Sequence, residues 1–511
     1  MKRSQAQPEV LKPLSTPPRP FSQPAVVPSV SPWQPIANQP PFNPGAMLLL
    51  TDGTLLVQDQ GAENSGSTGW WRFAPDINGS YLNGAWSQLA SLPAGFAPLY
   101  FDTAVLTDGR VIIVGGQYNN GQETSATRGA IYDPLTNQWT LLPPPPASAG
   151  SPFDSPGTVL ANGTFMIGAD DSTHQVLFNA ANLSWTITGS GKADINNEEN
   201  WSLLPNGEVL TVDANNYSNL TNSELYQPLS GGWSSAGSTI VKLDDTNADG
   251  SGTNELGPQL LRPDGTVFAA GATGHTSVYS SGTGTWTAGP DFPVIDGLPY
   301  DVVDGPAALL PSGKVLIAAS PGIYQTPTHF FVFDGALLQQ IADTPNAANI
   351  GSYYGFMIVL PTGQVMFNSR LGDIELFTET GAAIAANAVP AITVVPTSLV
   401  AGKSYLVSGR QLNGVSQGAA YAEGYQPATN YPLIRIVNAT TKHVFYARTF
   451  GFSGMSVTPG ADTSAQFTVP AGIETGNAML FAVANGIASA PVSVTVARPV
   501  GLNPVSITEP K

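Results

Sequence analysis

One short pattern, an apolar run that leads through a turn residue and Gly into a second apolar run, occurs seven times along the chain. The copies are LLLTDGTLLV, AVLTDGRVIIVGG, TVLANGTFMIG, SLLPNGEVLTV, QLLRPDGTVFAAG, ALLPSGKVLIA and IVLPTGQVMF. Their glycines are Gly53, Gly109, Gly163, Gly207, Gly265, Gly313 and Gly363, at successive spacings of 56, 54, 44, 58, 48 and 50 residues. This regular spacing predicts a repeat architecture, in which each unit buries its apolar faces against its neighbours.

Each copy is expected to form a β-hairpin. Asp-Gly, Asn-Gly and Ser-Gly supply the positive φ of a tight hairpin turn, and the flanking Val, Leu, Ile and Phe residues favour strands. In five units a Trp opens an outer strand: Trp86, Trp139, Trp185, Trp233 and Trp286. The unit is therefore a four-stranded sheet, and its period of about 50 residues is typical of a kelch-type blade. The sequence predicts an all-β fold with a seven-bladed β-propeller, because such sheets bury both faces by stacking around an axis.

We assign the propeller to residues 31–387. Residues 31–38 contain Trp33 and look like an outer strand, yet they precede the first hairpin, and the seventh repeat lacks such a strand. We therefore expect residues 31–38 to complete the last blade and close the ring. Residues 1–30 hold seven prolines and carry a formal charge of +3, and we interpret them as a Pro-rich basic arm.

After about residue 387 the Gly-anchored hairpins stop. Segments such as YPLIRIVNATTKHVFYARTF, SAQFTVPAG and NAMLFAVANG predict closely spaced strands. This pattern is typical of an immunoglobulin-like β-sandwich, which we assign to residues 388–499. Residues 500–511 are expected to be a C-terminal tail.

Composition limits the possible partners and chemistry. The chain has 511 residues, a formal charge of −17 and no cysteine. The negative charge argues against binding to nucleic acid, and the lack of cysteine excludes disulfides, thiolate metal sites and cysteine nucleophiles. No apolar run approaches the ~20 residues of a membrane span, and the basic start MKRSQAQPEV lacks the apolar region of a signal peptide.

A kelch-type propeller followed by such a sandwich resembles the galactose oxidase and glyoxal oxidase family. PLIRI, SAQFTVPAG and MLFAVANG are similar to the last domain of that family, which has an early-set immunoglobulin-like fold. The resemblance covers residues from about 31 to 498. It implies a copper ion at the axial mouth, held by two tyrosines and two histidines, with one tyrosine cross-linked to a cysteine.

The residues that match this copper site form an incomplete set. Tyr100 stands where the cross-linked tyrosine falls, with Tyr118 in the place of an aromatic residue that shields it, but no cysteine is available. Tyr353 matches the second tyrosine, Tyr354 occupies the place of a histidine, and His443 is the nearest candidate for the other histidine. Mononuclear copper sites favour imidazole nitrogens. We therefore expect neither copper nor the oxidation of alcohols or aldehydes.

The positions nine residues before the hairpin glycines are expected to lie at the start of the innermost strands, at one end of the axis. These positions and their neighbours include Tyr100, Asp102, Asp154, Glu198, Glu199, Glu255, Asp301, Asp304, Tyr353 and Tyr354. Carboxylates accept hydrogen bonds from sugar hydroxyls or bind hard cations, and tyrosine rings offer flat apolar faces. The alternatives are carboxylates that cap backbone amides, or a carboxylate pair that cleaves glycosides.

One local motif predicts a calcium site. In LDDTNADGSGTNEL, Asp245, Asn247, Asp249 and Gly250 have the spacing of a calcium-binding loop, in which alternate oxygens converge on one ion. Glu255 is a further candidate ligand, although it stands at the eleventh place of the loop and not the twelfth. A plain polar loop is the alternative.

We therefore predict a binding or structural protein without oxidase activity, located at a cell or particle surface and without a recognisable signal peptide. Its propeller mouth would bind a glycan or protein ligand. The first alternative is an enzyme, either an atypical copper-dependent oxidase or a carboxylate-based enzyme that acts on glycans. The second is a subunit of a homo-oligomer, linked through the basic arm.

Overall fold

The computed structural model describes residues 31–62, 65–123, 128–152, 154–421 and 425–499. These residues form an all-β protein with many antiparallel sheets and four single-turn 3-10 helices. None of their helices has the length and apolar character needed to cross a membrane. The predicted basic arm (1–30) and tail (500–511) lie outside the described residues, so the arm-linked assembly remains a sequence-based hypothesis.

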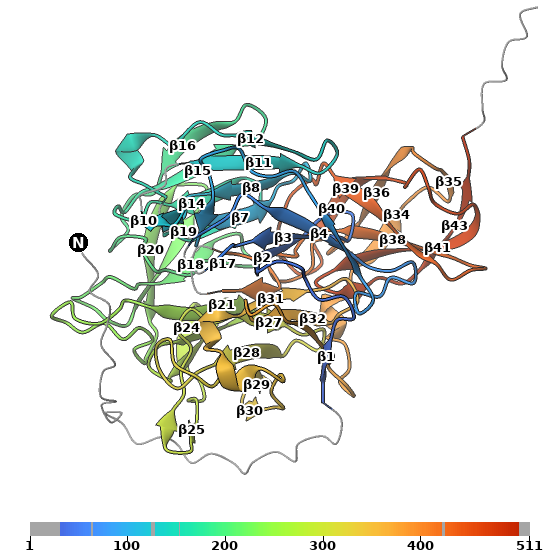
Figure 1. Cartoon of the computed structure of the whole chain (residues 1–511). Helices are drawn as coiled ribbons and strands as arrows, with labels where there is room; N and C mark the ends of the chain where they lie inside the picture. The colour runs from blue at the N-terminus through green and yellow to red at the C-terminus, as the bar shows by residue number, and fades with distance from the viewer. Residues whose placement is uncertain (1–30, 63–64, 124–127, 153, 422–424, 500–511) are drawn as a thin grey trace, which may run out of the picture.

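Seven sheets of similar topology follow one another along the described chain (Figure 1). The first sheet contains β2 (Pro44–Leu49), β3 (Leu55–Asp59), β4 (Trp70–Ala74) and β5 (Ala85–Gln88), and the second contains β7 (Asp102–Val105), β8 (Val111–Val114), β11 (Gly129–Asp133) and β12 (Gln138–Leu141). The third contains β13 (Gly157–Val159), β14 (Phe165–Gly168), β15 (Gln175–Asn179) and β16 (Ser184–Thr188), and the fourth contains β17 (Ser202–Leu203), β18 (Val209–Val212), β19 (Asn222–Gln227) and β20 (Gly232–Ser238). The fifth contains β21 (Leu256–Leu261), β22 (Thr266–Gly271), β23 (Thr276–Ser280) and β24 (Thr285–Ala288). The sixth contains β27 (Ala307–Leu309), β28 (Val315–Ala319), β29 (His329–Phe333) and β30 (Leu338–Gln340).

The seventh sheet joins the two ends of this region. It contains β31 (Phe356–Val359), β32 (Val365–Asn368) and β33 (Ile374–Phe377), and β1 (Trp33–Pro35) pairs with β33 at its outer edge. The first strands of the seven sheets contact one another in chain order, and β31 contacts β2. These innermost strands therefore form a closed ring.

The seven predicted hairpins are present, with a turn that differs from the expected two-residue type. Each repeat glycine has a positive φ, from 77° to 88°, but the residue before it does not. The amide of each glycine donates to the carbonyl three residues earlier, as in Gly53 to Leu50. This is a type I turn followed by a left-handed glycine. The Asp52 carboxylate accepts from the Thr54 amide, which explains why Asp, Asn or Ser precedes most of these glycines.

An aromatic pair recurs on the outer strands. Each repeat Trp lies opposite an aromatic residue of the neighbouring strand, with ring centroids 4.5–5.3 Å apart. The pairs are Phe73–Trp86, Tyr132–Trp139, Phe178–Trp185, Tyr226–Trp233, Tyr279–Trp286 and Phe377–Trp33. In the sixth sheet Leu338 stands opposite Phe333 in place of the Trp.

The same tryptophans connect neighbouring sheets. The Trp139 indole nitrogen donates to the carbonyl of Ala90 in the preceding unit, and Trp286 donates to the Ser223 hydroxyl at 2.9 Å. Trp33 donates to the carbonyl of Ala342, which follows the sixth sheet, at 2.7 Å. Each such bond spans two sheets, so the tryptophans hold the ring together at its periphery.

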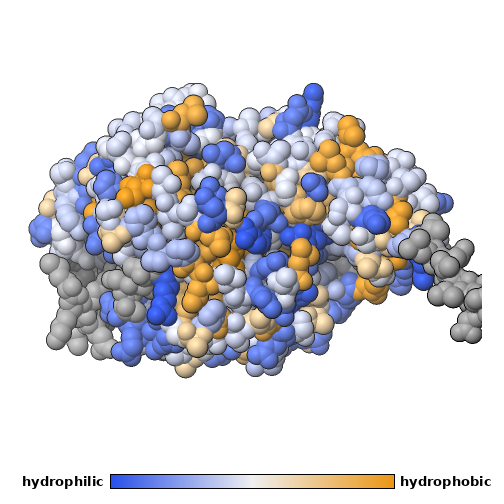
Figure 2. Space-filling model, turned by 90° about the horizontal axis from the view of Figure 1, so that it is seen from above, coloured by the Kyte–Doolittle hydropathy of each residue, from blue (hydrophilic) through white to orange (hydrophobic). Residues whose placement is uncertain are grey.

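A continuous nine-stranded sheet follows the ring. Its strands are β34 (Ala391–Val394), β35 (Ser398–Val400), β36 (Ser404–Arg410), β38 (Leu433–Asn438), β39 (Val444–Phe450), β40 (Asp462–Thr468), β41 (Gly476–Ala484), β42 (Ile487–Ala488) and β43 (Val492–Ala497). It lies to one side of the seven sheets (Figure 1). On the face drawn in Figure 2, hydrophobic residues lie in small groups among hydrophilic ones.

The described residues between β36 and β38, 411–421 and 425–432, return into the ring, and we call them the axial segment. Within it β37 (Ala419–Ala420) pairs with β27 and contacts β21 and β31. The Tyr425 hydroxyl accepts from the amide of Met47 and donates to its carbonyl. The Gln417 side chain accepts from the Leu203 amide and donates to the Thr158 hydroxyl. The segment thus satisfies backbone groups on the inner edges of several sheets.

We predict that Trp286→Ala lowers the free energy of unfolding by about 3–5 kcal/mol, because it removes the buried ring and its hydrogen bond to Ser223 of the preceding sheet. Trp286→Phe should cost about 1 kcal/mol, the value of one hydrogen bond. Urea titration measures both, and Thr285→Ala, an exposed position on the same strand, is the control. A Trp286→Ala variant as stable as the parent would contradict the role of the tryptophans.

Candidate ligand-binding site

Side chains from several sheets and from the axial segment meet at the end of the ring where the first strands begin, which we call the mouth. Its residues are Tyr100, Glu198, Glu255, Asp304, Tyr324, Tyr353, Tyr354, Arg370 and Tyr421. Of these, Tyr100, Glu198, Asp304, Tyr324 and Arg370 have a positive φ. Such backbone conformations are costly for residues other than glycine and are concentrated at functional sites.

Three predicted carboxylates form the acidic part of the mouth. Oxygen atoms of Glu198, Glu255 and Asp304 all lie within 4.8 Å of one another, and all three side chains are buried. The Asp304 amide donates to the carbonyl of Leu256, the residue after Glu255, so the backbone holds these two acids together. The Tyr324 hydroxyl donates to Glu255 at 2.8 Å. Burial and the neighbouring Glu255 carboxylate raise the pKa of Tyr324, so this phenol remains a hydrogen-bond donor.

Tyrosine rings lie next to the carboxylates. The rings of Tyr353 and Tyr354 are 3.9 Å apart, and Tyr324 meets Tyr353 edge-on at 4.6 Å. The Tyr324 side chain is 44 % exposed, so its ring is available to a ligand. Tyr421 of the axial segment donates to the Tyr353 carbonyl at 2.5 Å. Aromatic faces of this kind can stack against sugar rings or apolar side chains.

Arg370 forms the cationic part of the mouth. Its guanidinium lies 4.5 Å from the Phe356 ring, 5.2 Å from Tyr100 and 5.8 Å from Tyr354. The Nη1 group donates to the Tyr100 hydroxyl at 3.3 Å. Tyr118 meets the Tyr100 ring at 6.0 Å in an edge arrangement. The tyrosine that resembles a copper ligand is therefore engaged with a fixed positive charge.

Of the other predicted acids, Asp102 and Asp154 do not belong to the group of Glu198, Glu255 and Asp304. Asp102 is buried on β7, where its carboxylate accepts from the Thr103 amide at 2.6 Å, and burial raises its pKa well above the usual value. A Cβ at Gly157 of the next sheet would fall 1.4 Å from an Asp102 oxygen, so only glycine fits there. Asp154 is also buried, at the start of the third sheet.

The structure does not bring His443 to the mouth. Its Nδ1 lies 2.7 Å from a Glu474 oxygen, and the Val444 amide donates to Ile77 on the first sheet's outer turn. His443 therefore belongs to the contact between the C-terminal sheet and the outside of the ring.

Side chains of the calcium-like loop form hydrogen bonds with other residues of the same loop. Asp245 accepts from the Thr253 amide at 2.8 Å, and Asp249 accepts from the Ser251 amide at 3.0 Å. The Asn247 side-chain amide donates to the Ser251 hydroxyl at 3.0 Å. Glu255, the fourth predicted ligand, joins Glu198 and Asp304 at the mouth. The Glu255 amide donates to the Thr253 hydroxyl, which in turn donates to Asp245, so the loop leads directly into the mouth.

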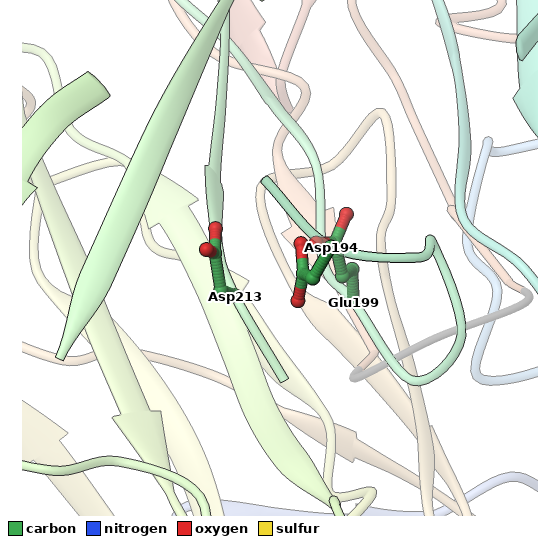
Figure 3. A group of neighbouring side chains, drawn as sticks. All are labelled: Asp194, Glu199 and Asp213. Carbon is green, nitrogen blue, oxygen red and sulfur yellow. The ribbon is translucent and has the colours of Figure 1, made fainter. Parts of the chain in front are cut away.

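Asp194, Glu199 and Asp213 form a second group of buried carboxylates (Figure 3). Lys192 extends into this group, and its ammonium lies 2.6 Å from Asp194, 2.5 Å from Glu199 and 3.2 Å from Glu224. The Lys192 side chain is fully buried. Its ammonium therefore occupies the place that a metal ion would take.

This Lys192 cluster fixes the loop that carries Glu198. Asp194 and Glu199 both belong to the loop, and the Trp201 indole donates to Glu199 at 3.1 Å. One lysine faces four carboxylates, so negative charge is in excess. Burial and the Asp194 carboxylate raise the pKa of Asp213 to about 7. Burial would lower the pKa of Lys192, but the surrounding carboxylates raise it, so the lysine stays charged.

Sequence reasoning missed Arg370, Tyr324, Tyr421 and Lys192. Arg370 follows β32, the second strand of its hairpin, which runs back to the mouth. Its place just after that strand is the signal in the sequence that could have indicated it. The stretch around Tyr421 has tyrosines among small residues, but nothing in it indicates return into the ring. No local pattern pairs Lys192 with Asp213 or Glu224.

We predict that protein stability falls as pH rises from about 4 to about 7. The Asp213 pKa lies near 7 in the folded state against 3.8 as its ordinary value, so the folded state holds a proton that the unfolded chain has lost. Buried Asp244 and Glu375, with pKa values raised to about 6 and about 7, act in the same direction.

Asp213→Asn should reduce this pH dependence, as measured by urea titrations at several pH values. Asp462→Asn, an exposed acid on β40, is the matched control. An unchanged slope in Asp213→Asn would show that Asp213 is ionised in the folded protein.

Comparisons with known proteins identify part of one repeat. Residues 103–146, which include the second hairpin and the strand of Trp139, match the Kelch motif. No curated protein sequence matches the chain significantly.

Solved structures with β-propeller folds are among those similar to the chain. Virginiamycin B lyase from Staphylococcus aureus has 10% sequence identity and a TM-score of 0.46, and the match covers 68% of this chain and 98% of that one. YCF48 bound to D1 peptide has 14% identity and a TM-score of 0.44, over 72% and 100% of the two chains. A functionally unknown protein from Desulfotomaculum acetoxidans has 14% identity and a TM-score of 0.40, over 61% and 89%. These likenesses say nothing about function.

Proposed function

We propose that the chain is a non-oxidase relative of the galactose oxidase and glyoxal oxidase family that binds a glycan at its mouth, at a cell or particle surface. In this proposal the ring is a seven-bladed kelch-type propeller, residues 31–38 close its last blade, and residues 388–499 form an early-set immunoglobulin-like sandwich. The observation that carries it is the meeting of Glu198, Glu255 and Asp304 with the tyrosines of the mouth.

The chemistry of these groups suits a sugar. Carboxylate oxygens accept hydrogen bonds from hydroxyl groups, and bonds to charged acceptors contribute about 1.5–3 kcal/mol each. The rings of Tyr324 and Tyr353 offer apolar faces for the C–H side of a pyranose. Because the backbone of the mouth is already fixed, ligand binding loses less conformational entropy.

The donor set argues against a copper centre. The chain has no cysteine for the cross-link, Tyr354 replaces one histidine, and His443 contacts Glu474. The Arg370 guanidinium beside Tyr100 would repel a cupric ion. These residues do not fit the group that the family resemblance implies, so we derive no oxidation step.

A divalent cation is a second candidate ligand, favoured by the convergence of three buried carboxylates at one point. Carboxylate oxygens are the ligands that calcium prefers. We propose that any calcium lies at Glu198, Glu255 and Asp304. The loop of Asp245, Asn247 and Asp249 is the alternative position that the sequence indicates.

We predict that Glu198→Gln weakens glycan binding by about 10- to 100-fold, because an amide is a weaker acceptor than a carboxylate. A glycan array selects the ligand, and isothermal titration calorimetry measures the affinity. Asp462→Asn, outside the mouth, should bind as the parent does. An array without any bound glycan, or an affinity unchanged in Glu198→Gln, would contradict the proposal.

Calcium binding distinguishes the two candidate cation positions. We expect Glu255→Gln to lower calcium affinity at least about 10-fold, as one charged ligand is lost, while Asp249→Ala has little effect. Calorimetric titration with calcium alone tests this. The opposite result, with loss only in Asp249→Ala, would assign the ion to the loop.

A further inference from the structure

Arg370 is a buried charge without a counter-ion among the residues that the structure describes. The residue is 8 % exposed, and its Nε has no hydrogen-bond partner in that part of the chain. No described carboxylate forms an ion pair with it. Its neighbours are the rings of Phe356, Tyr100 and Tyr354 and one phenolic hydroxyl. Ring faces compensate a buried cation only in part, and buried charges are normally paired.

The guanidinium lines a small cavity. The cavity has a volume of about 20 Å³, and besides Arg370 its polar lining residues are Gln58, Gln60, Tyr100, Tyr421 and Tyr425. That volume holds one water-sized group and not a pyranose ring. Only a group of that size, such as one oxygen of a ligand carboxylate, can enter it, while the rest of the ligand stays outside.

Tyr421 connects this cavity with the acidic part of the mouth. Burial raises the pKa of Tyr421 well above its usual value; Arg370 lowers it and the Asp304 and Glu255 carboxylates raise it, so all three charges lie within electrostatic range of this hydroxyl. The mouth therefore has a cationic and an acidic part close to one residue. A molecule with a carboxylate at one position and hydroxyl groups at others matches both parts.

We propose that Arg370 binds the carboxylate of a sugar acid, a pyranose that carries a carboxyl group, while its hydroxyls donate to the Glu198 group. This inference rests on the proposed glycan function and names the ligand class. Arginine suits the task because its guanidinium stays charged and donates charge-assisted hydrogen bonds to a carboxylate oxygen.

The test compares matched probes on the full chain by calorimetry, with and without calcium. The probes are sialyllactose against lactose, digalacturonate against galactobiose, and a short peptide with a free C-terminal carboxylate. We expect one or both acidic sugars to bind at least about 10-fold more tightly than the neutral partner. The two pairs distinguish sialic-type from uronic-type acids.

Variants of Arg370 test whether its guanidinium causes the preference for acidic over neutral sugars. Arg370→Met should abolish the preference for the acidic sugar, and Arg370→Lys, which keeps the charge without the guanidinium, should retain part of it. Arg410→Met, an exposed arginine on β36, is the control and should leave the preference unchanged.

Three outcomes would overturn the inference. Equal binding of acidic and neutral sugars would refute the sugar acid and leave the glycan function standing. Binding of the peptide without any sugar acid would replace the ligand class. Absence of binding to every sugar, on these probes and on the array, would refute the glycan function as well.

Discussion

The fold depends on hydrogen-bond partners for the backbone groups at the inner edges of the ring. The innermost strand of each sheet presents unpaired backbone groups toward the axis, and such groups are costly when buried. The axial segment supplies partners: β37 extends the sixth sheet, Tyr425 bonds both backbone groups of Met47, and Gln417 bonds the Leu203 amide. Because this segment belongs to the C-terminal sheet region, the two parts of the molecule stabilise each other.

The mouth is built on this arrangement. Tyr421 comes from the axial segment, Glu198 from a loop fixed by the Lys192 cluster, and Arg370 from the end of a strand in the seventh sheet. Positive φ values at Glu198, Asp304 and Arg370 persist because the surrounding contacts determine them. Among the described residues, the result is a fixed set of one cation, three carboxylates and several tyrosines, which is suited to a polar ligand with groups of both kinds.

The local part of the structure was predictable from sequence. The repeat glycines located the hairpins, and Trp139 and its equivalents marked outer strands, because turn chemistry and strand patterning act over a few residues. Counting nine residues back from the glycines also placed Glu198 and Asp304 at one end of the ring.

The remaining features depend on contacts between residues far apart in sequence. The sequence places Glu255 both in the calcium-like loop and among the mouth residues, and the contact that brings it to Asp304 joins positions about 50 residues apart, through the Asp304 amide and the Leu256 carbonyl. The axial segment and the pairing of Lys192 with Glu224 leave no local pattern. The Arg370 cavity likewise needs residues from the first, second and seventh sheets and from the axial segment, so no single stretch of sequence could indicate it.

The most direct test of the account is a crystal structure of the protein with a bound sugar acid. We predict density for the ligand carboxylate against the Arg370 guanidinium, with the sugar ring against the mouth tyrosines and its hydroxyls toward Glu198 and Asp304. A sugar acid bound at another surface, with the Arg370 cavity filled only by water, would contradict it.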